Sequence, residues 1–162
     1  MKETSQRRMF DYLLRNRINN FVGVPDSTMK HFIDQGLKKK KILIATREEE
    51  AIGISVGMCL SNSLSVVFMQ NAGFVNSIST ITSLLQLYEI PLIFVIGWRG
   101  YLKKDAPEHE KIGKIQPTIL KMLDLPSKII TDKNWEKNCR WALKTAKQKE
   151  SCALIIRRIF ND

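Results

Sequence analysis

The sequence has 162 residues, of which 44% are hydrophobic and 26% charged, and it carries a net charge of +10. This length suits one domain, predicted to span residues 1–162, which would bury roughly two-thirds of the surface of the unfolded chain. No apolar run reaches the ~18 residues that a membrane-spanning helix needs, and the N-terminal residues lack the apolar core of a signal peptide. We therefore expect a cytoplasmic protein and not a membrane or secreted one.

The cysteines and the charge argue against further classes of protein. Cys59, Cys139 and Cys152 are odd in number and widely spaced, which favours reduced thiols, and no ligands at short spacing suggest a metal site. Lys and Arg residues are spread along the chain apart from the run at residues 38–41, and no nucleic-acid motif accompanies them. We interpret the charge as a solvated basic face, which also suits an acidic partner subunit or an anionic substrate.

Apolar runs and helical periodicities alternate along the chain, a pattern typical of an α/β protein. Residues 64–70 and 91–97 are largely apolar, as expected of central parallel strands covered on both faces. We predict one doubly wound, mainly parallel sheet of about six strands with helices on both faces. In chain order the predicted elements are a helix at 5–17, a strand at 20–24, a helix capped by Asp26 or Ser27 and ending at Leu37, a strand at 42–45, a helix at 47–60 capped by Thr46, a strand at 64–70, a helix at 75–88, a strand at 91–97, a polar loop at 98–113, a helix at 116–123, an extended piece at 127–130, a helix at 134–149 and a strand at 153–158.

Four polar segments fall where predicted strands end. Ligands of such sheets bind at the carboxyl ends of the strands, so these segments are candidates for a site. The long polar loop is a further candidate, because loops of this kind often carry function. The four segments are Gly23-Val24-Pro25-Asp26-Ser27, Arg47-Glu48-Glu49-Glu50, Gln70-Asn71-Ala72-Gly73 and Gly97-Trp98-Arg99-Gly100.

The acidic run Glu48-Glu49-Glu50 opens an otherwise apolar helix. Carboxylates in a first turn complement the helix dipole by ~0.3–1 kcal/mol each, which alone explains most acidic helix starts. Successive helical residues project about 100° apart, so one of the three should face the apolar side, where a carboxyl group retains its proton more readily. Such a group suits proton transfer, and the spacing leaves both interpretations open.

Two other features have both a structural and a functional interpretation. The Gln70-Asn71-Ala72-Gly73 turn has small residues that let a backbone approach a ligand closely, although a plain turn would look the same. Neither a dinucleotide fingerprint nor a nucleoside-triphosphate loop is present. His109, in the polar loop, is either an idle surface histidine or a group that exchanges protons near pH 7.

Together these motifs carry a resemblance to a known family. In their order and approximate spacing they resemble sulfopyruvate decarboxylase alpha subunits and phosphonopyruvate decarboxylases, which use thiamine diphosphate. In that family this domain binds the aminopyrimidine of the cofactor, while a second domain binds the diphosphate through Mg²⁺ with a Gly-Asp-Gly…Asn signature. That signature is absent here, so the resemblance implies a diphosphate-binding beta subunit that holds the Mg²⁺ in a hetero-oligomer. The matching segments are the four strand-end segments, with Thr46 and Ala51 flanking the acidic run, together with Ile90-Pro91 and Pro107-Glu108-His109-Glu110-Lys111-Ile112-Gly113.

The resemblance implies the reaction and its catalytic residues. The reaction would be the conversion of 3-sulfopyruvate to sulfoacetaldehyde and CO₂, a carboxy-lyase activity. Glu48 matches the glutamate that shares a proton with the N1′ nitrogen of the cofactor. Asp26 and His109 match residues that are partners in protonating the intermediate left after CO₂ is lost.

It also implies which residues bind the cofactor and the substrate. For such a substrate we expect Arg99 to hold the sulfonate or phosphonate, because a guanidinium pairs with arrays of anionic oxygens. Ala72 departs from the family, which usually has Ser at this position. The expected cofactor-binding residues are Pro25, Glu48, Gln70, Asn71 and Gly73, and the expected substrate-binding residues are Asp26, Ser27, Arg99 and His109.

Other functions stay open at this stage. A related subunit acting on phosphonopyruvate or another 2-oxoacid would carry the same motifs. A non-catalytic domain of the same fold is a second alternative, against which Asp26, Glu48 and His109 argue. A nucleic-acid-binding domain rests on the charge alone.

Overall fold

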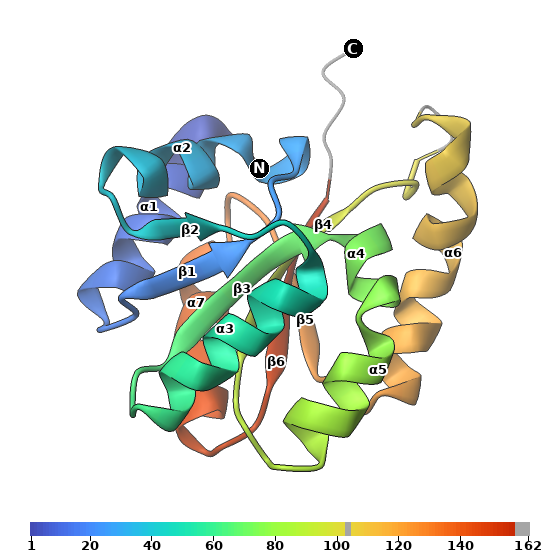
Figure 1. Cartoon of the computed structure of the whole chain (residues 1–162). Helices are drawn as coiled ribbons and strands as arrows, with labels where there is room; N and C mark the ends of the chain where they lie inside the picture. The colour runs from blue at the N-terminus through green and yellow to red at the C-terminus, as the bar shows by residue number, and fades with distance from the viewer. Residues whose placement is uncertain (103–104, 158–162) are drawn as a thin grey trace.

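The structure is a computed structural model that describes residues 1–102 and 105–157 (Figure 1). No helix in this part of the chain is both long and apolar enough to cross a membrane. The strands are β1 (Asn20–Gly23), β2 (Ile42–Ile44), β3 (Ser65–Gln70), β4 (Ile93–Trp98), β5 (Ser127–Ile130) and β6 (Cys152–Arg157). The helices are α1 (Glu3–Arg15), η1 (Ser27–Met29), α2 (Lys30–Lys38), α3 (Glu48–Leu60), α4 (Asn71–Asn76), α5 (Ile78–Thr80), η2 (Ile81–Gln86), α6 (Pro107–Met122) and α7 (Trp135–Lys147).

The six strands form one parallel sheet in the order β2-β1-β3-β4-β6-β5. From β1 the chain adds β2 on one side and then returns to add β3 on the other, so the direction of winding reverses between β1 and β3. The predicted fold class, a doubly wound α/β sheet of about six strands, is therefore confirmed. In sheets of this kind, ligands bind at the carboxyl ends of the strands where the winding reverses.

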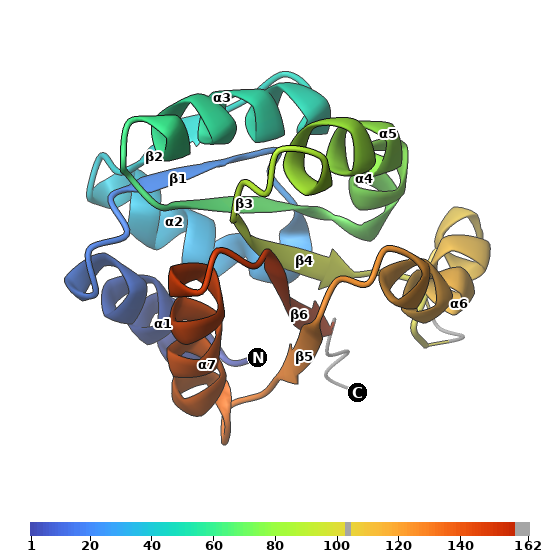
Figure 2. The same cartoon turned by 90° about the horizontal axis from the view of Figure 1, so that it is seen from below.

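Helices cover both faces of the sheet, and each face has its own apolar core (Figure 2). On one face α1, α2 and α7 pack against the strands around a cluster of aromatic rings. The ring centroid of Phe10 lies 4.2 Å from that of Phe21 and 5.2 Å from that of Phe32. On the other face α3, α4, η2 and α6 pack around Phe74 and Phe94. Strands β3 and β4 have five buried residues each, as predicted for strands covered on both sides.

Burial also explains the chemistry of two cysteines. All three cysteines are free thiols, and burial raises the pKa of Cys139 and Cys152 to about 12. A thiol with such a pKa is almost fully protonated at neutral pH and is a poor nucleophile.

Two helix starts were predicted wrongly. Helix α4 begins at Asn71, four residues before the predicted start, so the Gln70–Gly73 segment is the first turn of a helix and not a loop. Helix α6 begins at Pro107, nine residues early, so the last seven residues of the predicted polar loop, 107–113, are helical, while residues 103–104 of that loop lie outside the described residues. Proline suits a first helical position, and the acidic residues Glu108 and Glu110 favour a first turn.

Two smaller predictions concern the N-cap of α3 and the end of the last strand. Arg47 and not Thr46 is the N-cap residue of α3, and no side chain caps that helix. Thr46 contributes its backbone N–H, which donates to Glu50 Oε2 at 2.7 Å. The predicted last strand was to end at Arg158, which lies outside the described residues, whereas β6 is seen to Arg157.

Pro117 lies inside α6, where it has no N–H to donate to the carbonyl of Gly113. The indole Nε1 of Trp98, at the end of β4, donates to this carbonyl at 2.9 Å. One side chain of the sheet therefore satisfies the backbone acceptor that proline leaves open, and it holds the middle of α6 against β4.

We expect Trp98→Phe to lower the free energy of unfolding by roughly 1–3 kcal/mol, because it leaves the Gly113 carbonyl without a donor. In a Pro117→Ala background the alanine N–H can bond to that carbonyl, so the same change should cost less. Urea unfolding of the four proteins in this double-mutant cycle measures the difference. Equal losses in both backgrounds would show that the indole stabilises the fold through packing alone.

Candidate active site

Predicted site residues gather at the carboxyl edge of the sheet, where β1, β3 and β4 end and α3 begins. The register pairs Gly23 with Phe68 and Gln70 with Gly97, so the three strands end nearly level. The Asp26 turn and the Gln70 turn, which are 44 residues apart in the sequence, are joined here by a hydrogen bond. The edge is therefore built by parallel pairing and not by sequence proximity.

Asp26 is the most enclosed acid of this edge, with 1% of its side chain exposed. Its Oδ2 accepts from Thr28 N at 3.0 Å, which caps η1, and its Oδ1 accepts from Gln70 Nε2 at 3.0 Å. The carboxylate lies against Gly97, where any side chain would collide with Oδ2. Asp26 is thus fixed in one orientation by two donors and by the bare backbone of β4.

Glu48 lies in the first turn of α3 and is half-buried. Its carboxylate lies directly against the α-carbon of Gly73 in α4, so that a Cβ at position 73 would overlap Oε1. Among the described residues Glu48 has no hydrogen-bond or ion-pair partner. Glu50, by contrast, is exposed and bonded to the Thr46 backbone. Of the two, it is Glu48 that faces the Gln70–Gly73 segment.

Asn71 joins α4 to the end of β4. It is fully buried, its Nδ2 donates to Arg99 O at 2.9 Å, and its Oδ1 accepts from Arg99 N at 3.3 Å. Both polar ends of the amide are therefore bonded within the chain, and Asn71 ties the start of α4 to the end of β4.

Arg99 is bound by a residue that the sequence analysis did not identify. Its Nε and Nη2 donate to the two oxygens of Asp105 at 2.9 and 2.7 Å, in the forked geometry that carboxylates and guanidinium groups favour. The remaining terminal nitrogen, Nη1, donates to Ser27 Oγ at 3.4 Å and lies 4.0 Å from Asp26 Oδ1. The forked hydrogen bonds to Arg99 hold the pKa of Asp105 well below its usual range.

His109 lies in the first turn of α6 and not in a loop, and it is half-buried. This turn packs closely on the end of β4, because Gly100, with a φ of +71°, has no side chain where the carbonyl of His109 lies. Gly113 allows the next turn the same close approach to Arg99 and Gly100. The imidazole has no hydrogen bond or ion pair with another described residue, so the structure does not join it directly to Asp26.

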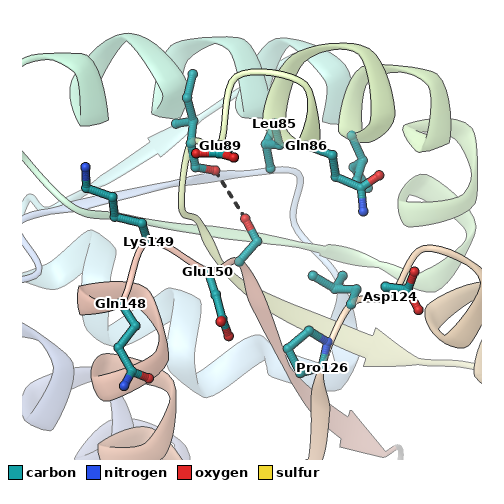
Figure 3. Close-up of a pocket in the computed structure, with 12 residues that line it drawn as sticks. Leu85, Gln86, Glu89, Asp124, Pro126, Gln148, Lys149 and Glu150 are labelled. Carbon is teal, nitrogen blue, oxygen red and sulfur yellow. Dashed lines mark hydrogen bonds between the residues drawn. The ribbon is translucent and has the colours of Figure 1, made fainter.

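Pro25 and Ser27 lie at the surface beside Asp26. They border an open depression of about 350 Å³ that continues over Lys30 to Leu37 and Ile44. A second open depression, of about 520 Å³, lies at the opposite edge, where β4, β5 and β6 begin; Figure 3 shows Gln86, Glu89, Asp124 and Lys149 among its lining residues. None of the predicted site residues lines that second depression.

Comparison with known proteins identifies the family to which the chain belongs. Residues 4–121 match the family described as thiamine pyrophosphate enzyme, N-terminal TPP binding domain. The match covers more than two-thirds of the chain, and the chain belongs to this family. The resemblance drawn from the motifs is confirmed.

Particular relatives are decarboxylases and their subunits. Sulfopyruvate decarboxylase subunit alpha from Methanocaldococcus jannaschii is 32% identical over 121 residues, which are 74% of this chain and 72% of the relative. The protein of the same name from Methanococcus maripaludis is 30% identical over 73% of this chain and 72% of its own. Phosphonopyruvate decarboxylase from Streptomyces viridochromogenes is 30% identical over 71% of this chain but only 30% of its own length.

The Asp105–Arg99 pair predicts a pH-dependent stability. Because the folded-state pKa of Asp105 is lowered, the pair contributes fully above the ordinary aspartate pKa of about 4, and the contribution is lost as the pH falls below that value. Asp105→Asn should therefore lower the free energy of unfolding by roughly 1.5–3 kcal/mol at pH 7 and by less at pH 3. Urea unfolding at both pH values measures this.

Asp34→Asn is the matched control, because Asp34 is half-buried but has no hydrogen bond or ion pair with another described residue. It should change stability little at either pH. An equal loss at pH 7 and pH 3 for Asp105→Asn would mean that the carboxylate charge adds nothing to the fold.

Proposed function

We propose that this chain is the alpha, pyrimidine-binding subunit of a thiamine-diphosphate-dependent 2-oxoacid decarboxylase that converts 3-sulfopyruvate to sulfoacetaldehyde and CO₂. The observation that carries the proposal is the placement of Glu48. In a chain of this family, a half-buried carboxylate that no other described residue bonds lies against a bare glycine at the carboxyl edge of the sheet. The alpha subunits among its relatives support the same assignment.

The residues at this edge fit the aminopyrimidine of the cofactor. When bound, thiamine diphosphate supplies a ring nitrogen that exchanges a proton with a carboxylate, and it accepts the electrons released when CO₂ leaves. Glu48 would hold that proton, since its carboxylate is not used by the protein. Gly73 leaves room for the Glu48 carboxylate, and Pro25 and Gln70 lie at the same edge of the sheet.

Asp26 and His109 are proposed as the residues that return a proton to the substrate carbon. Asp26 is fixed by Thr28 and Gln70, so its carboxylate keeps one direction. His109 has an imidazole that no described residue binds, and its backbone carbonyl packs on Gly100 just after β4. Ser27 lies beside Asp26 at the surface and would contact the substrate.

The proposal includes a diphosphate-binding beta subunit that holds the Mg²⁺, because this chain lacks the Gly-Asp-Gly…Asn signature. Helix α3 supports it. After its three acids the helix carries no charged residue up to Leu60, and a Cβ at Gly53 or Gly57 would meet no atom of the described residues within 4 Å. A helix without a polar face is normally covered on all sides, so its open side suits a partner's surface.

Three further points belong to this proposal. Residues 1–162 form one pyrimidine-binding domain, because the described residues build a single sheet with a core on each face. The assembly works in the cytoplasm, where its thiols stay reduced. Phosphonopyruvate is the second candidate substrate, favoured by the 30% identity to a phosphonopyruvate decarboxylase.

Cofactor-dependent release of CO₂ tests the proposal. This chain, co-expressed with a beta subunit encoded by an adjacent reading frame, should release CO₂ from one of 3-sulfopyruvate, phosphonopyruvate and pyruvate only with thiamine diphosphate and Mg²⁺ present. The chain alone should release none, because half of the site belongs to the partner. Turnover by the chain alone would refute the split site, and silence of a stable complex on all three acids would refute the proposed activity.

Glu48→Gln tests the proton transfer. The amide keeps the shape of the side chain but cannot carry the proton, so the complex should assemble normally and turn over ~10²–10⁴-fold more slowly. Glu49→Gln is the matched control, since Glu49 lies in the same turn and is also half-buried. It should keep nearly the full rate. If the loss appears in Glu49→Gln and not in Glu48→Gln, the role belongs to Glu49.

A further inference from the structure

The Arg99–Asp105 pair lies between the two proposed proton donors and is enclosed, with 11% of the Arg99 side chain and 2% of the Asp105 side chain exposed. Asp105 comes just before α6, which carries His109, and Arg99 follows β4 beside Asp26. The pair therefore connects the helix that carries His109 with the turn that carries Asp26. The proposed function requires these two residues to keep a fixed position relative to each other.

On one side, the carboxylate of Asp105 fixes the start of α6. Besides Arg99 it accepts from Gly100 N at 2.9 Å and from Ala106 N, the N-cap residue of α6, at 2.9 Å. Gly100 is also the residue on which the carbonyl of His109 packs. A single carboxylate thus ties the end of β4 to the turn that precedes His109.

On the other side, Arg99 is held against the turns that follow β1 and β3. Its Nη1 donates to Ser27 Oγ at 3.4 Å and lies 4.0 Å from Asp26 Oδ1, and its backbone N–H and carbonyl are both bonded to Asn71. Arg99 therefore contacts the turn that places Asp26 as well as the start of α4.

The local charge argues against the predicted role of Arg99 as the group that binds an acidic substrate. One guanidinium lies between two enclosed carboxylates, Asp105 in a forked pair and Asp26 at 4.0 Å. The guanidinium is thus already paired, so an incoming sulfonate would have to displace Asp105 from it. Forked pairing also leaves few of the Arg99 donors free.

We propose that Asp105 and Arg99 are positioning residues, which together set where His109 stands relative to Asp26, and that Arg99 does not bind the acidic group of the substrate. This inference rests on the proposed decarboxylase function. It assigns a role to Asp105, and it moves the recognition of the substrate's second anionic group to other residues of the complex.

Steady-state kinetics of the assembled complex distinguish positioning from anion binding. Asp105→Asn and Arg99→Lys should each lower kcat by about 10- to 100-fold, since a small misplacement of reacting groups has effects of this size. KM for 3-sulfopyruvate should stay within about twofold, and the fall in kcat should be the same for any slower 2-oxoacid that the complex accepts. A rise in KM confined to 3-sulfopyruvate would overturn the inference and make Arg99 an anion-binding residue.

Asp11→Asn is the control variant, because Asp11 is also partly buried and bonded, to Gln35 and Lys39, but on α1, away from the site. It should lose stability without changing kcat. Size-exclusion chromatography of each complex and thiamine diphosphate binding check that the variants assemble and bind cofactor as the wild type does.

Amide hydrogen exchange separates this inference from the proposed function, because it needs no turnover. Asp105→Asn should raise exchange at residues 105–113 by at least tenfold, while residues 135–147 in α7 stay within twofold of the wild type. If the wild-type complex proves inactive on every acid but this local change appears, the proposed function fails and the link between β4 and α6 stands. Unchanged exchange at residues 105–113 would overturn the positioning role directly.

Discussion

The parallel pairing of β3 with β4 is the constraint on which the site depends. Both strands are buried on both faces, and their register runs from Val66 with Ile93 to Gln70 with Gly97. That last pair sets the Gln70 side chain beside the bare backbone of Gly97, and Asp26 fills the space above it. A slip of one residue would reverse the faces of a whole strand, so burial of the cores also fixes the geometry of the edge.

Helix α3 combines a charged first turn with an apolar remainder. Its first turn presents a carboxylate to the site, whereas the rest of the helix is apolar and leaves Gly53 and Gly57 open on the outside. Exposure of such an apolar surface to water is unfavourable, so a partner that covers the helix would stabilise it. A site completed by a second subunit would explain both properties, because the surface that assembles the complex then begins beside the residue that does the chemistry.

The distribution of charge at the edge differs from the charge of the whole chain. The sequence carries a net charge of +10, yet at this edge Arg99 lies between two enclosed acidic residues, Asp26 and Asp105. The excess positive charge therefore lies elsewhere, mostly on exposed lysines and arginines that can attract anions over a distance without binding them. The net charge of the chain can attract an anionic molecule, but it does not determine which residues bind that molecule.

The sequence by itself determined the architecture and the proposed proton-carrying residue. Alternating apolar runs and helical periods define a doubly wound parallel sheet, because strands buried on both faces need uninterrupted apolar residues. Motif order identified the family, and with it Glu48, Asp26 and Gly73. These residues lie in short sequence motifs, which can be recognised without the three-dimensional structure.

Only the tertiary structure decided where α6 begins, and with that the surroundings of His109. Gly113 and Pro117 both weaken a helix, and the sequence analysis predicted the start at residue 116, between them. The fold compensates for both residues: Trp98 supplies the donor that Pro117 lacks, and Gly113 and Gly100 allow the helix and β4 to touch. Asp105 could not be identified for the same reason, since its partners Arg99, Gly100 and Ala106 meet it only once α6 is folded against the end of β4.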